Sequence, residues 1–242
     1  MKFVSFIIVA ATIAFVLLKD PTVTSKVNDV TFSYIVKYPA GVDKKAVLPM
    51  LVALHGNGDK PKNFYESALD AYTQPVRIVV LQGPISFGWG KAWPWQAESL
   101  TRYGDALHDV IVSLANKYPT QGKPALLGFS GGGQMAYYQA VTHGGDYSYI
   151  FPISGRLSTA DLATTQLPDQ RRSKVKVHAF HGKKDSVVGF SKGQEAVKIL
   201  KERGVRVVFT EFDGDHQGVF RSMKMRITNI VQQYLAKVAT ND

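Results

Sequence analysis

Short apolar runs alternate along the chain with segments of helical periodicity from about residue 30 onward. The runs are rich in Val, Ile, Leu and Phe, and several are continuously apolar, which is typical of strands buried on both faces of a sheet. Seven runs are predicted as strands: residues 31–38, 48–54, 76–81, 125–129, 149–153, 175–180 and 205–212.

Apolar residues recur at helical spacing between and after these runs. The segments concerned are residues 107–114, 134–140, 196–200 and 220–238. The third has recognisable ends, because Ser191 and Gln194 are spaced as a capping box and Gly204 follows the last periodic residue. Strands that alternate with helices predict right-handed βαβ units and one mostly parallel sheet flanked by helices, which is an α/β fold.

No internal repeat, low-complexity tract or linker divides this pattern. A chain of 242 residues is commonly one domain when its fold is of the α/β type. We therefore predict a single folded domain over residues 26–242.

The first 25 residues are predicted to lie outside the fold. Met1 and Lys2 form a short basic start, and residues 3–18 carry neither a charge nor a proline. This is typical of a secretory signal peptide, with cleavage after Ser25 in a small-residue context. Two alternatives stay open. The stretch is longer than most signal cores and shorter than a spanning helix, so an uncleaved signal anchor and a buried helix of a cytoplasmic protein stay open beside the cleaved signal peptide.

The composition is that of a globular protein, and it excludes several classes of chain and of functional site. The sequence has 45% hydrophobic and 20% charged residues, which excludes a wholly disordered or coiled-coil chain. It has no cysteine, so disulfides, thiolate zinc sites, iron–sulfur clusters and a cysteine nucleophile are excluded. The same lack of cysteine is compatible with an extracytoplasmic location.

The net charge of +10 is concentrated near the C-terminus. Residues 171–242 hold 15 Lys and Arg against 7 Asp and Glu. These basic residues are spread singly along predicted helix faces, without the stacking aromatics or zinc-finger spacing of nucleic-acid-binding modules. The charge therefore favours a solvated basic surface, and we expect no specific nucleic-acid partner.

Chemically active residues follow the predicted strands, at the edge of the sheet where α/β proteins place their sites. Residues 128–132 read Gly-Phe-Ser-Gly-Gly and match the pattern G-x-S-x-G, with an apolar run before them and a helical segment after them. A strand, a sharp turn and a helix in this order lift a serine hydroxyl out of the sheet. The alternative is a glycine-rich turn with an idle serine. A phosphate-binding loop is not favoured, because no lysine follows the glycines.

A serine becomes a nucleophile only with a base and a third group that orients the base. Asp185 and His216 follow two later strands, and no other histidine comes after Asp185. The chain order serine, acid, histidine is the order of this type of fold, and it selects Ser130, Asp185 and His216 as catalytic residues. Asp213 is the reserve acid. The plainer alternatives are a turn-forming Asp185 and a surface His216.

Backbone N–H groups that stabilise a developing oxyanion are predicted at Gly131 and Asn57. Gly131 directly follows the serine, and Asn57 lies between two glycines after the second strand. His55 is expected to brace this loop rather than to act as a base. The three tryptophans lie within seven residues of one another. They predict either a structural plug or the wall of a substrate pocket, with Trp93 or Trp95 in contact with substrate.

Together these motifs resemble the α/β-hydrolase superfamily and, within it, the phospholipase/carboxylesterase group of small serine esterases, which includes acyl-protein thioesterases and polyester-depolymerase-like esterases. The matching segments are residues 55–59, 128–133, 153–155, 181–188 and 214–216. The resemblance implies a single-domain fold without a large lid, and it gives the triad roles to Ser130, Asp185 and His216. Gly131 departs from the thioesterase branch, which usually has glutamine there.

We therefore expect a secreted or periplasmic serine esterase that hydrolyses small-molecule carboxylic esters without a metal or a cofactor. Two alternatives remain: a serine peptidase of the prolyl-oligopeptidase type, and a catalytically silent hydrolase fold that serves as a binding protein. Contact with a membrane is expected only through an uncleaved N-terminal anchor.

Overall fold

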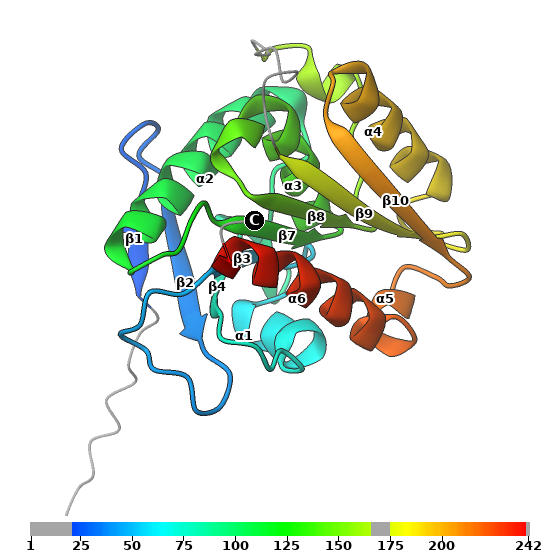
Figure 1. The fold of residues 1–242 in the computed structure, drawn as a ribbon. Coiled ribbons are helices and arrows are strands. Elements are labelled where there is room, and N and C mark those ends of the chain that lie inside the picture. The colour runs from blue at the N-terminus through cyan, green and yellow to red at the C-terminus, as the bar shows by residue number, and fades with distance from the viewer. Residues whose placement is uncertain (1–20, 166–174, 241–242) are drawn as a thin grey trace, which may run out of the picture.

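The computed structural model describes residues 21–165 and 175–240. Its centre is an eight-stranded sheet with the order β1-β2-β4-β3-β7-β8-β9-β10 (Figure 1). The pairs β1–β2 and β2–β4 are antiparallel, and every other pair of the sheet is parallel. The strands are β1 Thr22–Thr24, β2 Thr31–Lys37, β3 Met50–Leu54, β4 Arg77–Leu81, β7 Ala125–Phe129, β8 Tyr149–Ile153, β9 Lys176–Gly182 and β10 Arg206–Phe212.

Helices cover both faces of the sheet (Figure 1). The longer ones are α2 Ala97–Lys117, α3 Gly131–Thr142, α4 Phe190–Glu202 and α6 Lys224–Thr240. The shorter ones are α1 Pro61–Phe64 and α5 Gly218–Arg221, with single turns at Tyr65–Leu69, Gly144–Asp146 and Ala160–Leu162. Buried side chains of α2, α3 and α4 form one hydrophobic cluster, and those of α1, α5 and α6 belong to a second cluster. The predicted α/β fold is therefore confirmed.

The seven predicted strands are all present, with each end within two residues of its expected position. β3, β4, β7 and β8 are buried at every position, which explains why the pattern there lacks alternation. Arg77, the first residue of β4, is the polar exception. Its guanidinium donates to the carbonyl oxygens of Ala46 and Pro119 at 3.1 and 2.7 Å, so the buried charge is hydrogen-bonded.

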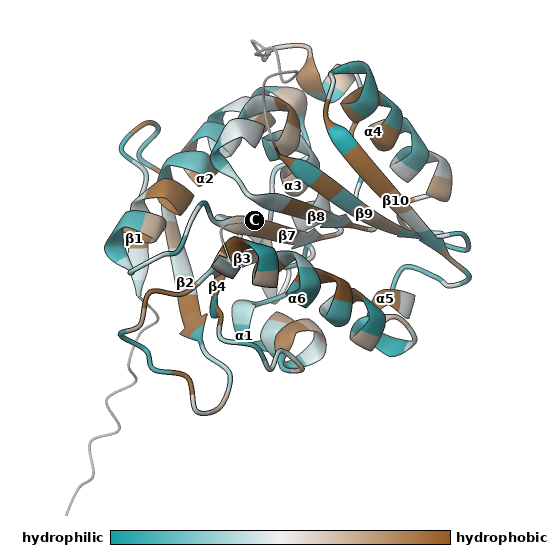
Figure 2. Ribbon diagram, viewed as in Figure 1, coloured by the Kyte–Doolittle hydropathy of each residue, from teal (hydrophilic) through white to brown (hydrophobic). Residues whose placement is uncertain are grey.

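Two predictions about helix ends are wrong. α4 begins one residue before Ser191 and its N-cap is Gly189, so Ser191 and Gln194 do not form a capping box. The last predicted helix is divided into α5 and α6. α6 itself is amphipathic, with polar and apolar stretches in alternation along its turns (Figure 2). Ile227, Val231 and Leu235 recur every four residues and are buried in the second hydrophobic cluster.

The segment between β4 and α2 contains a hairpin that the sequence pattern did not predict. Its strands are β5 Ile85–Phe87 and β6 Gly90–Ala92, and Gly88 in the turn has a φ of 55°. Strands of three residues are too short to show a period in the sequence, which is why the hairpin was not predicted.

The fold begins earlier than the predicted first strand at residue 31. β1 pairs with β2, with Thr22 opposite Ser33. Ser25 is buried, and its hydroxyl and the N–H of Lys26 both donate to Asp109 on α2, at 3.1 and 2.6 Å. The boundary predicted after Ser25 therefore falls among residues that are tied to the sheet and to α2.

Residues 1–20, which include the apolar stretch at 3–18, lie outside the described residues. Among the helices of the described part of the chain, none has both the length and the apolar character needed to cross a membrane.

Candidate active site

Ser130 lies in the sharp turn between β7 and α3. Its φ is 54° and its ψ is −114°, a strained backbone conformation for a residue with a side chain. The turn is possible because Gly128 has no side chain, since a Cβ there would collide with the carbonyl group of Gly132. The N–H of Ser130 donates to the carbonyl of Ile153 at 2.9 Å, which ties the turn to β8. The hydroxyl is thus presented at the carboxyl edge of the sheet.

Asp185 and His216 form the central hydrogen bond of the site. His216 Nδ1 and Asp185 Oδ2 are 2.7 Å apart, and both residues are buried. The other carboxylate oxygen of Asp185 accepts the N–H groups of Val187 and Val188 at 3.0 and 2.8 Å. Because Asp185 is acceptor-only when ionised, Nδ1 of His216 carries the shared proton and Nε2 is left to act as a base.

Phe129 places the imidazole of His216 beside the serine turn. The two ring centroids are 4.8 Å apart, and Phe129 directly precedes Ser130. Within the described part of the chain, no hydrogen bond joins the Ser130 hydroxyl to His216. Such bonds are often long in free enzymes and tighten when the substrate binds. The structure therefore pairs the predicted acid with the predicted base and brings that pair against the turn of the predicted nucleophile.

The reserve acid Asp213 is occupied elsewhere. Its carboxylate is 75% exposed and lies 2.9 Å from Lys184 Nζ. The hydrogen bond and charge of Lys184 lower the pKa of Asp213 below its ordinary value. Asp213 is thus a surface ion-pair residue, and Asp185 is the acid that contacts His216.

His181 is a neighbour of the Asp185–His216 pair that the sequence analysis did not assign. It is fully buried, and its Nε2 donates to the carbonyl of Val188 at 2.8 Å and lies 3.4 Å from Asp185 Oδ2. Burial lowers the pKa of His181, which favours the neutral ring. The feature of the sequence that could have singled out His181 is its position near the end of β9, four residues before Asp185. Its contact with Val188 holds the loop that carries Asp185.

The two predicted oxyanion donors, Asn57 and Gly131, lie close to each other beside the serine turn. Gly131 is the first residue of α3, where backbone N–H groups have no partner within the helix and the helix dipole is positive. Among the described hydrogen bonds, none uses the N–H of Gly131 or of Asn57 as donor. The Asn57 carboxamide lies against Gly131, since a Cβ on Gly131 would collide with Asn57 Oδ1. That oxygen also accepts the N–H of Trp93 at 2.9 Å.

His55 braces the loop that carries Asn57, as predicted. It is fully buried, its Nδ1 donates to the carbonyl of Gly56 at 2.7 Å, and its Nε2 accepts the N–H of Gly83 at 3.0 Å. Burial lowers the pKa of His55, so the neutral ring with one donor and one acceptor is favoured. Both ring nitrogens are used by the backbone, which leaves none for acid–base chemistry.

Trp93 belongs to the core, which corrects its assignment to substrate contact. It is 1% exposed, its Nε1 donates to the carbonyl of His55 at 2.8 Å, and its ring stacks on Phe32 with centroids 6.3 Å apart. A side chain enclosed in this way supports the loop that carries His55 and Asn57. Trp95 is different, because it is 43% exposed and packs edge-on against Phe87 at 6.2 Å. Its contact with substrate stays a prediction.

Known proteins share this fold. The family model described as phospholipase/carboxylesterase matches residues 95–237, a range that includes Ser130, Asp185 and His216. Acyl-protein thioesterase 1 of Neurospora crassa is 24% identical over 216 residues, which cover 78% of this chain and 88% of that protein.

Two solved structures superpose on most of the chain. The Bacillus cereus carboxylesterase gives a TM-score of 0.67 at 13% identity and covers 86% of this chain and 94% of its own. Acyl-protein thioesterase 2 of Zea mays gives a TM-score of 0.64 at 23% identity and covers 84% of this chain and 98% of its own. At these identities the likeness shows a common fold.

Proposed function

The chain belongs to the phospholipase/carboxylesterase family, and from this premise we propose that it hydrolyses carboxylic esters through an acyl-enzyme on Ser130. The observation that carries the proposal is the 2.7 Å hydrogen bond between His216 and Asp185, placed against a turn in which Ser130 has a φ of 54°. Segments that follow three different strands thus bring a hydroxyl, a base and an acid to one edge of the sheet, which is the arrangement that nucleophilic catalysis by serine requires.

Acylation uses these groups in a fixed order. His216 Nε2 takes the proton of the Ser130 hydroxyl as its oxygen attacks the carbonyl carbon of the ester. The carbonyl oxygen becomes an oxyanion and accepts hydrogen bonds from the N–H groups of Asn57 and Gly131. The bond to the alcohol then breaks, and His216 gives the proton to the leaving oxygen. Asp185 keeps the ring oriented and stabilises its protonated form.

Deacylation repeats the sequence with water as the nucleophile. His216 removes a proton from water, the hydroxide attacks the acyl carbon, and the bond to the Ser130 oxygen breaks. His216 returns the proton to that oxygen and the free acid leaves. Every proton and electron pair is accounted for by the substrate, water and three side chains, so the proposal includes no metal and no cofactor.

The substrate contacts are proposed at the hairpin of β5 and β6. Phe87 and Trp95 are 49% and 43% exposed, and Trp89 in the turn is 98% exposed. Exposed aromatic rings of this kind suit the apolar part of a small ester. Backbone hydrogen bonds from Gly58 to Lys91 (2.8 Å) and from Lys91 to Asp59 (3.1 Å) join the hairpin to the loop that carries Asn57. We therefore place the apolar group of the substrate against Trp95.

A secreted or periplasmic location is the second part of the proposal. It is supported by the uncharged stretch at residues 3–18 behind Lys2 and by the lack of cysteine. A retained anchor is the alternative. No specific nucleic-acid partner is proposed, because the basic residues of the last third of the chain are spread singly.

Replacement of the nucleophile tests the reaction. We expect Ser130→Ala to lower kcat/KM for p-nitrophenyl acetate by about 10⁴-fold or more, since no other group can form the acyl-enzyme. Its melting temperature should stay at or above that of the wild type, because the strained residue is not a core residue. Ser67→Ala is the matched control, since among the described residues that hydroxyl donates only to the carbonyl of Phe64, at 3.3 Å. Activity of Ser130→Ala within tenfold of the wild type would contradict the proposal.

A substrate panel separates the remaining alternatives. p-Nitrophenyl esters of increasing chain length, an acyl thioester and a peptide amide are hydrolysed in parallel by the wild type and Ser130→Ala. An esterase hydrolyses the oxygen esters fastest, a peptidase prefers the amide, and a silent hydrolase fold hydrolyses none of them. The thioester arm matters because two of the similar proteins are acyl-protein thioesterases.

A further inference from the structure

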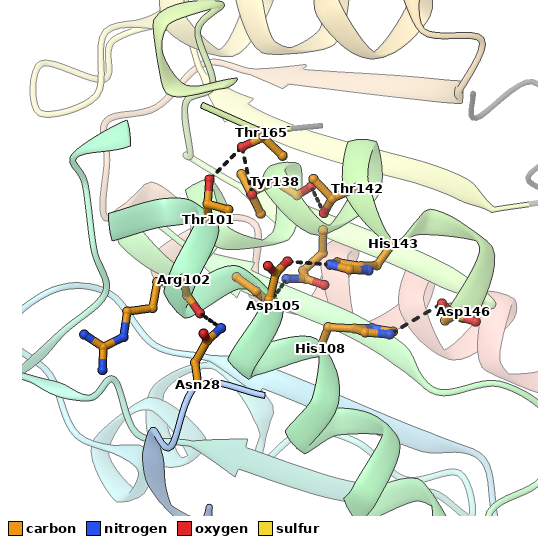
Figure 3. A network of polar contacts seen from close by, with 12 residues as sticks. Asn28, Thr101, Arg102, Asp105, His108, Tyr138, Thr142, His143, Asp146 and Thr165 are labelled. Atoms are coloured by element: carbon orange, nitrogen blue, oxygen red, sulfur yellow. Dashed lines mark hydrogen bonds and ion pairs between the residues drawn. The ribbon is translucent and has the colours of Figure 1, made fainter. Parts of the chain in front are cut away.

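A second cluster of titratable side chains lies between α2 and the C-terminal end of α3 (Figure 3). Asp105 and His108 are three residues apart on α2, His143 is the C-cap of α3, and Asp146 ends the short helical turn that follows. α3 starts next to Ser130 and has 12 residues, so its two ends are about 18 Å apart. The cluster is therefore separate from the active site.

The two imidazoles of the cluster are stacked, with centroids 4.0 Å apart and planes inclined by 3°. His143 Nε2 lies 3.1 Å from Asp105 Oδ1. An ionised carboxylate only accepts, so this contact puts the proton of the neutral His143 ring on Nε2 and the lone pair on Nδ1. In Figure 3 the second ring nitrogen of His143 lies on the side of Asp146. A carboxylate that receives the outer N–H is the usual way in which a metal-binding histidine is oriented.

His108 and Asp146 are spaced like two ligands of one ion. His108 Nε2 is 3.6 Å from Asp146 Oδ2, which is too long for a hydrogen bond. Two ligands of a tetrahedral zinc ion with bonds of 2.0–2.1 Å are separated by about 3.4 Å. One ligand atom from each of His108, His143 and Asp146 lies within 4.8 Å of the other two. The two ring planes are parallel, so both rings must tilt toward each other for their in-plane lone pairs to meet at one ion.

The electrostatic surroundings also favour a cation. The carboxylates of Asp105, Asp109 and Asp146 all act on the His108 ring. The C-terminal end of α3, at His143, adds the negative end of a helix dipole.

We propose that His108, His143 and Asp146 bind a divalent transition metal ion, with Asp105 as the residue that orients His143. Two imidazole nitrogens with one carboxylate oxygen suit Zn²⁺ and its neighbours, whereas Mg²⁺ and Ca²⁺ prefer oxygen ligands alone. Asp146 is 57% exposed, so solvent supplies the remaining ligand. The ion would join α2 to the end of α3 and would stabilise the fold without touching Ser130. No motif predicts this site, because its two histidines are 35 residues apart.

Metal titration of the untagged protein tests the proposal. The full chain is treated with EDTA, dialysed, and titrated with ZnCl₂ in a calorimeter and with CoCl₂ in a spectrophotometer. We expect one ion per chain, a visible Co²⁺ absorption band and a higher melting temperature with Zn²⁺. The rate of p-nitrophenyl acetate hydrolysis should not require the metal. The absence of saturable Zn²⁺ binding by the wild type would overturn the proposal.

Variants place the ion at the cluster. We expect Asp146→Asn to weaken Zn²⁺ binding at least 10-fold and His108→Ala to weaken it further, while Asp105→Asn weakens it about 10–100-fold. Asp70→Asn is the matched control, since Asp70 is also half-exposed and pairs with Lys224 on another part of the surface. Equal affinity of Asp146→Asn and the wild type would show that the ion binds elsewhere. Asp146 is exposed, so this variant remains informative if His108→Ala does not fold.

Discussion

Asp185 is held from two sides, and this determines how His216 presents its free nitrogen. One carboxylate oxygen accepts two backbone N–H groups of its own loop, and the other accepts the proton of His216. Asparagine at position 185 can keep the first set of contacts through its side-chain oxygen. Its NH₂ group would then face Nδ1 and favour the wrong tautomer of the ring.

We therefore expect Asp185→Asn to lower kcat/KM by about 10⁴-fold while the circular dichroism spectrum is unchanged. Asp213→Asn is the paired control, and its rate should stay within about twofold of the wild type because an exposed ion pair contributes little. The reverse outcome, with a large loss only for Asp213→Asn, would transfer the acid role to Asp213.

The sequence could predict that Asp185 and His216 lie together near the Ser130 turn, but not the surroundings of each aromatic side chain. Ser130, Asp185 and His216 follow strands whose order is legible from the apolar runs, so chain order alone pairs them. Trp93 and Trp95 are two positions apart, yet one is enclosed by Phe32 and the backbone of His55 and the other is on the surface. That difference depends on neighbours from distant parts of the chain, which no local pattern contains.

At the scale of the elements, predictability depends on length and burial. β3, β7 and β8 are five residues long and buried on both faces, so their composition alone marks them as strands. β1, β5 and β6 have three residues each and are held by pairing with a neighbour rather than by a pattern of their own. The sequence pattern therefore did not predict the hairpin of β5 and β6, and the only local signal was the close spacing of the three tryptophans.

β9 carries a histidine that makes the stability of the fold sensitive to acid. His178 Nε2 lies 2.8 Å from Thr210 Oγ1, and the ring stacks on Phe180 with centroids 4.5 Å apart. Burial, with a smaller effect from the charge of Arg226, lowers the pKa of His178 to about 4. In the unfolded chain the pKa of His178 is about 6.5. Between about pH 4 and 6.5 the unfolded chain therefore binds a proton at His178 and the folded protein does not.

The free energy of unfolding should therefore fall as the pH is lowered from about 6.5 towards 4. His55 and His181 act in the same direction, because burial lowers their pKa values too. His178→Gln should make the decline shallower without removing it. Melting temperatures at pH values from 4.5 to 8 check this, and parallel curves for the wild type and His178→Gln would contradict it.

At the scale of the whole molecule, the N-terminal segment connects the fold to the proposed location. Cleavage after Ser25 would remove β1 and the contact of Ser25 with Asp109, and it would leave Lys26 as the first residue. β1 is a three-residue edge strand whose residues are partly or fully exposed, so we expect the shortened chain to remain folded and active at a lower melting temperature.

Expression of the full sequence in a bacterium tests the location. The protein should appear in the periplasm or the medium, and mass spectrometry should find a chain that begins at or near Lys26. Chains starting at residues 21 and 26, made without the leader, show what β1 contributes: the second should melt roughly 2–6 °C lower, for the loss of a few hydrogen bonds. Recovery of the intact chain in the membrane fraction would instead support an anchor.

Part of the positive charge of the chain lies around a cleft on the protein surface. Lys123, Lys176, Arg206 and Lys237 surround a surface cleft of about 420 Å³. Three of them belong to the last third of the chain, where the positive charge was expected on a solvated surface. The cleft lies where β9 and β10 begin, whereas Asp185 and His216 follow the ends of these strands. The basic surface is thus separate from the proposed reaction.

The most direct measurement of the central claim is the identification of the residue that a fluorophosphonate modifies. Such probes react only with an activated serine, and peptide mass spectrometry locates the adduct. A single phosphonate on the peptide that contains Ser130, formed in the wild type, slowed in Asp185→Asn and absent from Ser130→Ala, is the predicted result. An unmodified wild-type protein, or an adduct on a different serine that persists in Ser130→Ala, would contradict the account.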